Sequence, residues 1–157
     1  MSNRVLILQP SHYLSKNDRR IYKTKRRSVV SLTLPYLAAL VPDGWDVELL
    51  DEQIQDIDFD KKFDIIVISS WTINSLRAYD VVREFRKLGI KVVIGGPHTF
   101  FYPDEAVEYC DAVAIGEGEK LLPRILNDAA NGKLEKIYRS EMLQDLSKLP
   151  FPRYDKL

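Results

Sequence analysis

The residues best suited to chemistry follow runs of apolar residues that predict buried strands. The run 92–94 is followed by Gly95, Gly96, Pro97 and His98. Two adjacent glycines remove side chains at the carboxyl end of a strand, where open parallel sheets bind ligands. We therefore expect a large cofactor to approach the backbone here. Two other interpretations stay open: the glycines form a tight exit turn, and His98 caps a turn or bonds a carbonyl.

Three other predicted strands end in similar polar or glycine-containing turns. The carboxyl ends of parallel strands share one edge of the sheet, so the four turns should form a ring. The predicted site residues are Gln9, Pro10, Ser11, Ser69, Ser70, Trp71, Thr72, Gly95, Gly96, Pro97, His98, Gly116, Glu117 and Gly118. The two serines after the third strand bond a ligand or cap the next helix, and Trp71 shields a ligand or packs against another domain. Glu119 is expected to be only a first-turn acid of a helix.

The ring depends on strands that alternate with helices. Apolar runs at 5–8, 47–51, 65–68, 91–95 and 112–115 predict five strands, and apolar residues at helical spacing lie between them. Such alternation indicates a parallel sheet. We predict an α/β fold of three layers, Rossmann-like and of the flavodoxin-like type, with strand order 2-1-3-4-5 and helices on both faces.

Composition limits the function classes. The 157 residues are 45% hydrophobic, enough for one packed domain, and 23 basic residues balance 23 acidic ones, so no net field favours nucleic acid or an anionic membrane. The basic loop 19–27 is expected to be a solvated surface, or a docking surface for another domain or an anionic substrate. No apolar run approaches the ~20 residues that span a bilayer, and a lone cysteine, Cys110, suits a reducing compartment, so we expect a cytoplasmic protein.

Missing motifs narrow the site further. No G-x-G-x-x-G follows the first strand and no Walker motif occurs, which argues against a nucleotide site. The strand ends at Gln9 and Ser69 lack the acids of a phosphoacceptor domain. A flavin is not excluded, because Trp71 can stack on its ring. We predict no catalytic residue and no metal ligand in this chain.

Several segments, in order, resemble the N-terminal cobalamin (vitamin B12)-binding domain of cobalamin-dependent radical S-adenosylmethionine (radical SAM) enzymes. They are residues 33–40, 47–51, 92–98, 103–106, 111–119 and 149–153. The resemblance implies that cobalamin is held at the carboxyl edge of the sheet, with its nucleotide tail in a crevice and no histidine on cobalt. His12 agrees, because it lacks the aspartate and glycine of cobalt-ligating histidine loops. His98 is then expected to bond a peripheral amide of the corrin.

The same resemblance implies a larger protein. Residues 1–140 are expected to form the cobalamin domain, and 141–157 a linker toward a C-terminal radical SAM core of the same polypeptide. That core would hold a [4Fe–4S] cluster, S-adenosylmethionine and most of a small-molecule substrate, since one cysteine cannot ligate the cluster. The expected reaction of the intact enzyme is methyl transfer to a substrate radical. Two alternatives stay open: a cobalamin-free docking module, and a flavodoxin-like flavin or nucleotide binder.

Overall fold

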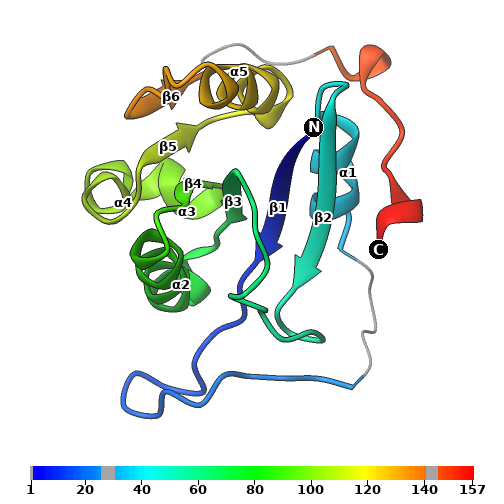
Figure 1. Cartoon of the computed structure of the whole chain (residues 1–157). Helices are drawn as coiled ribbons and strands as arrows, with labels where there is room; N and C mark the ends of the chain where they lie inside the picture. Colours follow the sequence, from blue (N-terminus) through cyan, green and yellow to red (C-terminus); the bar gives the residue numbers. More distant parts are fainter. Residues whose placement is uncertain (1, 26–30, 141–144) are drawn as a thin grey trace.

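The computed structural model describes residues 2–25, 31–140 and 145–157. Its centre is one parallel sheet of six strands, in the order β2-β1-β3-β4-β5-β6 (Figure 1). The strands are β1 (Asn3–Gln9), β2 (Trp45–Asp51), β3 (Ile65–Ser69), β4 (Lys91–Gly95), β5 (Ala112–Ile115) and β6 (Ile137–Arg139). The predicted α/β class and the order 2-1-3-4-5 are confirmed, but the prediction of five strands is wrong.

The sixth strand has almost no sequence signal. β6 is three residues long and pairs with Val113–Ile115 at the edge of the sheet. Only Tyr138 in it is buried; its hydroxyl donates a hydrogen bond to Asp128 at 3.0 Å and accepts one from the Glu135 backbone at 2.9 Å. A single inward side chain between exposed neighbours gives no apolar run, which is why the strand was missed.

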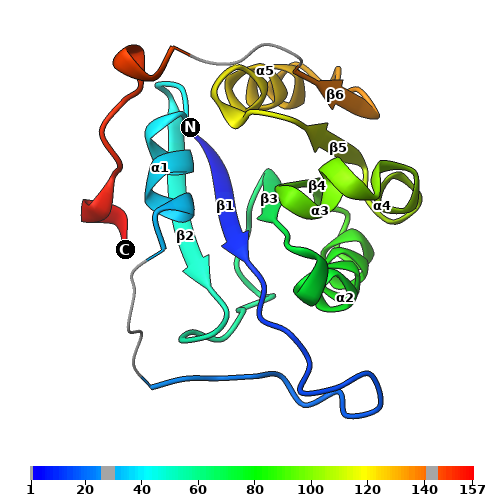
Figure 2. The same cartoon turned by 180° about the vertical axis from the view of Figure 1, so that it is seen from behind.

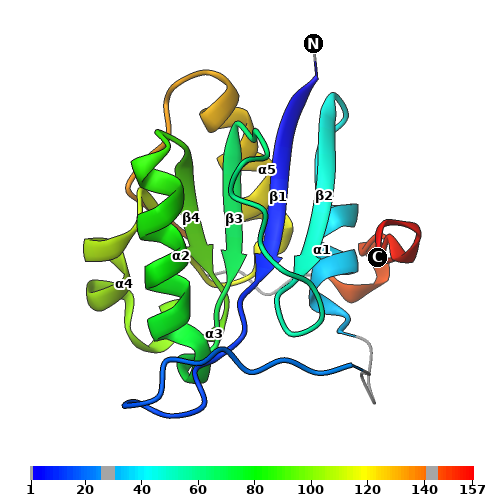
Figure 3. The same ribbon diagram turned by 60° about the horizontal axis from the view of Figure 1, so that its bottom comes forward.

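Helices cover both faces of the sheet. α1 (Thr33–Ala39) and α5 (Gly118–Ala130) pack on one face, and α2 (Ser75–Lys87) and α4 (Pro103–Tyr109) on the other (Figures 2 and 3). A short α3 (Pro97–Phe101) follows β4, and 3-10 turns cover Thr72–Asn74, Leu146–Lys148 and Tyr154–Lys156. None of the helices in the parts of the chain described above is long and apolar enough to cross a membrane.

Burial on both faces explains the continuous apolar runs of the strands. In β1, Leu6 and Leu8 belong to the core under α2 and α4, and Val5 and Ile7 to the core under α1 and α5. All four are at most 1% exposed. A strand covered on both sides must be apolar at every inner position, as is typical of parallel sheets.

The C-terminal segment lies beside α1 and β2 (Figure 1). The Arg153 backbone N–H donates a hydrogen bond of 2.8 Å to the carbonyl of Pro35 in α1. Phe151, in the same segment, is 93% exposed. The first four residues of the predicted linker, 141–144, lie outside the described residues, and the linker role stays a prediction.

The lone cysteine gives a test of this fold. Cys110 is fully buried, and burial raises the pKa of its thiol to about 11. We expect a disulfide reagent at pH 8 to label the native chain far more slowly than the chain in denaturant. Because the unfolded thiol ionises first, native stability should fall between about pH 9 and 11. Rapid labelling of the native protein would contradict the buried placement.

Candidate cofactor site at the carboxyl edge

An apolar cavity of about 210 Å³ opens between α1 and α5 at the carboxyl edge of the sheet. Val67, Val93 and Ala114 form its floor on β3, β4 and β5, while Leu37 and Leu122 line it from the two helices. Its depth depends on small residues in the strands. A Cβ on Gly95 would lie only 3.3 Å from that of Ala114, so a side chain there would crowd the floor at Ala114.

The structure brings half of the predicted ring to this cavity. The predicted residues that line it are Ser69, Trp71, Gly95, Gly96, Pro97, Gly116 and Gly118. They come from three of the four turns. Sequence reasoning missed the deeper lining residues Leu37, Val67, Val93, Leu121 and Ile125 as site residues, because an apolar residue that lines a cavity has the same pattern as one that fills a core. The signal that could have found the cavity is the pair of small residues, Gly95 and Ala114.

Ser69 is the polar group in the cavity that stands out. It is 5% exposed, and its hydroxyl has no hydrogen-bond partner among the described residues. The neighbouring Ser70 differs, because its hydroxyl is bonded to Asn74 at 3.0 Å. A hydroxyl of a residue that lines an open cavity, with no partner within the described protein, is suited to bond a ligand.

The first turn of the predicted ring does not line the cavity. Gln9 accepts a hydrogen bond from the Ser31 hydroxyl at 3.1 Å, and the Pro10 carbonyl accepts one from Asn74 at 2.8 Å. Ser11 is fully buried, and its hydroxyl donates to the Tyr22 carbonyl at 2.6 Å. This turn therefore anchors the segment that follows β1.

The other predicted residues lie around the cavity rather than in it. Glu117 is exposed in a shallow groove beside the start of α1. Glu119 is in the first turn of α5, as expected, and accepts a hydrogen bond of 2.7 Å from Tyr36. Burial and this carboxylate raise the pKa of Tyr36.

His98 is 2% exposed, and its ring bonds Tyr79 of α2 rather than lining the cavity. Burial lowers the pKa of its imidazole although the nearby Glu105 carboxylate opposes this, so the ring is neutral at pH 7. Its backbone N–H donates to the Ser70 carbonyl at 3.0 Å. His98 thus supports the turn, and its contact with a corrin amide stays a prediction.

Gly96 joins the two turns at the mouth of the cavity. Its φ is +96°, and a Cβ there would lie 2.8 Å from the carbonyl oxygen and 2.9 Å from the nitrogen of Ser70. Gly116 is equally restricted, because a Cβ would lie 2.4 Å from the Ser140 oxygen just after β6. The chain's own backbone therefore requires both glycines, whatever the ligand.

Gly96→Ala should cost about 3 kcal/mol or more of unfolding free energy, since it combines backbone strain with an unavoidable overlap. Gly89→Ala is the matched control: Gly89 also has a positive φ, +77°, but nothing lies within 4 Å of its Cβ position. The control should lose only about 1 kcal/mol. If urea unfolding showed the same loss of unfolding free energy for Gly96→Ala and Gly89→Ala, the close contact between Gly96 and the Ser70 backbone would be contradicted.

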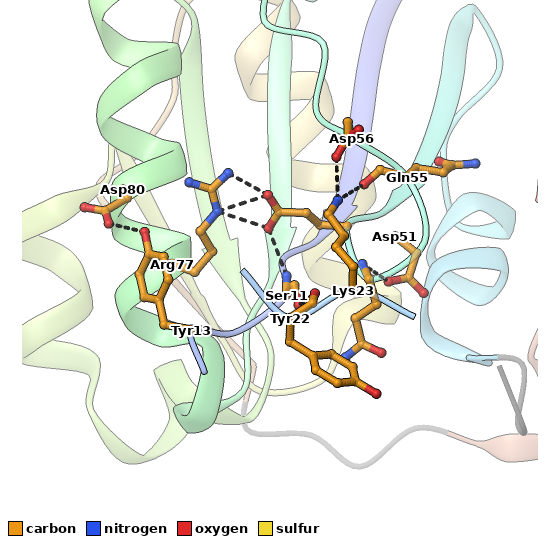
Figure 4. A network of polar contacts seen from close by, with 11 residues as sticks. Ser11, Tyr13, Tyr22, Lys23, Asp51, Gln55, Asp56, Arg77 and Asp80 are labelled. Carbon is orange, nitrogen blue, oxygen red and sulfur yellow. Dashed lines mark hydrogen bonds and ion pairs between the residues drawn. The ribbon is translucent and has the colours of Figure 1, made fainter. Parts of the chain in front are cut away.

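The segment after β1 crosses the carboxyl edge of the sheet (Figure 3). A buried ion pair holds its beginning: Arg77 makes a two-pronged contact with Glu52, which also accepts a 3.0 Å hydrogen bond from the Ser11 backbone (Figure 4). Farther along the segment, Lys23 pairs with Asp56 at 2.7 Å.

The basic residues of this segment are largely paired. Arg19 bonds Asp80 and Arg20 bonds Asp18, each at 2.6 Å. Arg26 and Arg27 lie outside the described residues. His12 stacks on Tyr22, with ring centroids 4.9 Å apart. Within the described parts of the chain, no group of three or more His, Cys, Asp or Glu residues is arranged to hold a metal ion.

A Rossmann-like sheet with an apolar crevice at its carboxyl edge defines a domain that binds a ligand at the ends of its strands. Residues 26–126 match the B12 binding domain family. The chain belongs to this family, whose cofactor is cobalamin.

Curated relatives are methyltransferases much longer than this chain. The chain is 37% identical over 119 residues to bacteriochlorophyllide d C-8(2)-methyltransferase of Chlorobaculum tepidum, covering 75% of this chain and 26% of the relative. It is 31% identical over 126 residues to bacteriochlorophyllide d C-12(1)-methyltransferase of the same organism, covering 78% of this chain and 27% of that relative. The chain therefore spans about a quarter of the length of these relatives.

One solved structure with the same fold is the radical S-adenosylmethionine methyltransferase TsrM from Kitasatospora setae, determined with tryptophan substrate and a SAM analog. The TM-score is 0.64 at 20% sequence identity, over 84% of this chain and 26% of that chain. At this identity the likeness supports the fold.

Proposed function

We propose that this chain is the cobalamin-holding domain of a longer radical SAM methyltransferase. In this proposal the corrin lies over the carboxyl edge of the sheet, and the nucleotide tail enters the cavity between α1 and α5. The observation that carries the proposal is the apolar cavity itself, which opens at the edge where the family's cofactor is expected.

The lining of the cavity fits the aromatic base of the cobalamin tail. Val67, Val93 and Leu122 offer apolar contact, and Gly95 leaves room for a flat ring. The free hydroxyl of Ser69 is suited to bond a ring nitrogen. Trp71, half exposed at the mouth, would cover part of the corrin or the neighbouring domain.

The remaining predicted site residues have a supporting role in this proposal. Gln9, Pro10 and Ser11 fix the segment that crosses the edge, and Ser70 fixes the turn before α2. The corrin would rest against these segments. The chain's own residues bind and orient the cofactor, and bound cobalamin would supply methyl-transfer chemistry at its cobalt.

A radical SAM core in the same polypeptide is the proposed partner. Support comes from the relatives, which are methyltransferases about four times as long as the matched region, and from the radical SAM neighbour with the same fold. That core would provide the [4Fe–4S] cluster, S-adenosylmethionine and most of the substrate pocket. The 157-residue chain alone is expected to show no turnover.

Titration with hydroxocobalamin tests the proposal. We expect a single equivalent of corrin to remain with the chain through gel filtration and its visible spectrum to shift. Flavin mononucleotide, as the control, should leave the melting temperature unchanged. A folded chain that retains no corrin would overturn the proposal, and binding of a separately produced core by that chain would then indicate a docking module.

A further inference from the structure

A chain of four polar side chains runs from the carboxyl edge into the α2/α4 side of the protein. The hydroxyl of Thr72 lies 3.4 Å from His98 Nδ1, and His98 Nε2 lies 2.7 Å from the Tyr79 hydroxyl. That hydroxyl lies 2.9 Å from Glu105 Oε1, and the same carboxylate oxygen lies 3.6 Å from His98 Nε2. His98 and Tyr79 are 2% and 4% exposed, so the middle of the chain is shielded from water.

The direction of these hydrogen bonds is fixed from the Glu105 end. An ionised carboxylate only accepts, so the single proton of the Tyr79 hydroxyl is donated to Glu105. The Tyr79 oxygen must then accept from His98 Nε2–H. A neutral imidazole carries one proton, which leaves Nδ1 as an acceptor for the Thr72 hydroxyl.

The opposite direction is unfavourable. If Tyr79 donated to His98, its oxygen and Glu105 Oε1 would face each other at 2.9 Å with no proton between them. The burial of Tyr79 raises its pKa, and Glu105 adds to this effect, so its hydroxyl stays protonated at neutral pH. In this arrangement the Thr72 hydroxyl donates to His98 Nδ1, which leaves the lone pairs of its exposed oxygen for an outside donor.

We propose that the Thr72–His98–Tyr79–Glu105 chain makes Thr72 an acceptor-only group that selects a hydrogen-bond donor, a primary carboxamide, on the edge of the corrin. Thr72 is exposed and directly follows Trp71, which lines the cavity mouth. A carboxamide N–H can donate to the Thr72 oxygen, whereas a carboxylate at the same place would oppose its lone pairs. The inference rests on the proposed binding of cobalamin.

Affinities for hydroxocobalamin and for its separated monocarboxylic acid isomers test the proposal. We expect at least one isomer, in which one carboxamide is replaced by a carboxylate, to bind about tenfold more weakly to the wild-type chain. Thr72→Val keeps the shape of this exposed side chain and should reduce that preference to near unity. Equal binding of all isomers by the wild type, or an unchanged preference in Thr72→Val, would overturn it.

The double variant Tyr79→Phe/Glu105→Ala tests the relay separately. It keeps the ring stacked on Tyr109, 4.0 Å away, but removes both oxygens that can accept from His98 Nε2–H, which lie 2.7 and 3.6 Å from Nε2. His98 is then free to carry its proton on Nδ1 and donate to Thr72, so the carboxamide preference should fall as in Thr72→Val. Glu105→Gln is the control: it retains an acceptor oxygen for Tyr79, and the preference should persist.

Nitrogen NMR of the imidazole rings gives a readout that needs no ligand. The chain has two histidines, so His12→Gln assigns the signals. We expect the Nε2–H tautomer for His98 at pH 7 in the wild type and its loss in Tyr79→Phe/Glu105→Ala, where neither nearby oxygen is left to accept from Nε2–H. An Nδ1–H tautomer in the wild type would contradict the chain. Failure of all corrins to bind would instead contradict the proposed function. The NMR tautomer of His98 would then still decide whether the Thr72–His98–Tyr79–Glu105 chain has the hydrogen-bond direction given above.

Discussion

Replacing Ala114 by leucine should abolish tight cobalamin binding while leaving the fold intact. Ala114 is on the floor of the cavity, beside the space that Gly95 leaves open, so a leucine would occupy the volume proposed for the base. An aromatic group of this size buries at least about 150 Å², worth about 4 kcal/mol at 25 cal/mol per Å². Excluding it should weaken binding about a thousandfold.

Ala114→Ser is the matched control for this experiment, because it changes the same residue but adds only one atom. Its affinity should stay within about threefold of the wild type, and both variants should unfold with cooperative transitions close to the wild-type midpoint. Unchanged hydroxocobalamin affinity in Ala114→Leu would show that the tail does not enter this cavity.

Arg77→Met should produce the largest loss of stability among single changes at the polar network of Figure 4. The Glu52 side chain is 2% exposed and that of Arg77 13% exposed. Burial alone would lower the pKa of Arg77, but the hydrogen bonds and charge of Glu52 outweigh it and raise that pKa. Removing the guanidinium leaves a buried carboxylate without its cation, which costs about 3–5 kcal/mol.

Urea unfolding measures this loss against a surface pair. Lys87 and Glu84 lie 2.8 Å apart with side chains 62% and 44% exposed, so Lys87→Met should change the unfolding free energy by less than about 0.5 kcal/mol. The double variant Glu52→Gln/Arg77→Met should recover part of the loss, because no buried charge remains. An Arg77→Met variant as stable as Lys87→Met would contradict the buried pair.

Strand periodicity predicted most of the fold because burial on two faces leaves long apolar runs. The run at 65–68 is fully within a strand that ends at Ser69, and the predicted strand 91–95 matches β4 at both ends. β6 has one buried residue, Tyr138, and its pairing depends on β5 rather than on its own pattern. Such an edge strand is specified by tertiary contact.

Helix ends were harder to predict. The helix α1 begins at Thr33, and Leu32 at the cap position makes no side-chain capping bond, so no capping residue marks this end in the sequence. The residues Gly95–His98 were predicted as a turn, yet Pro97 is the first residue of the helix α3. Proline suits the first turn of a helix, and this signal was present but not used.

The ring of turns indicated the correct edge of the sheet but not the orientation of each side chain. His98 and Ser11 are polar residues at that edge whose side chains bond within the protein. The partner of His98 is Tyr79, on a helix that precedes it in the chain. The partner of Ser11 is the Tyr22 carbonyl, in a segment without a periodic apolar pattern. Sequence spacing gives the strand end, whereas the packing of neighbouring helices decides which way a side chain turns.

Comparing hydroxocobalamin with a cobinamide, which has the same corrin but no nucleotide tail, tests the central claim most directly. If the cavity between α1 and α5 holds the tail, the chain should bind hydroxocobalamin tightly and the cobinamide about a thousandfold more weakly. Equal affinity for the two corrins, measured by equilibrium dialysis, would contradict a tail in the cavity, and retention of neither would contradict cobalamin binding by this chain.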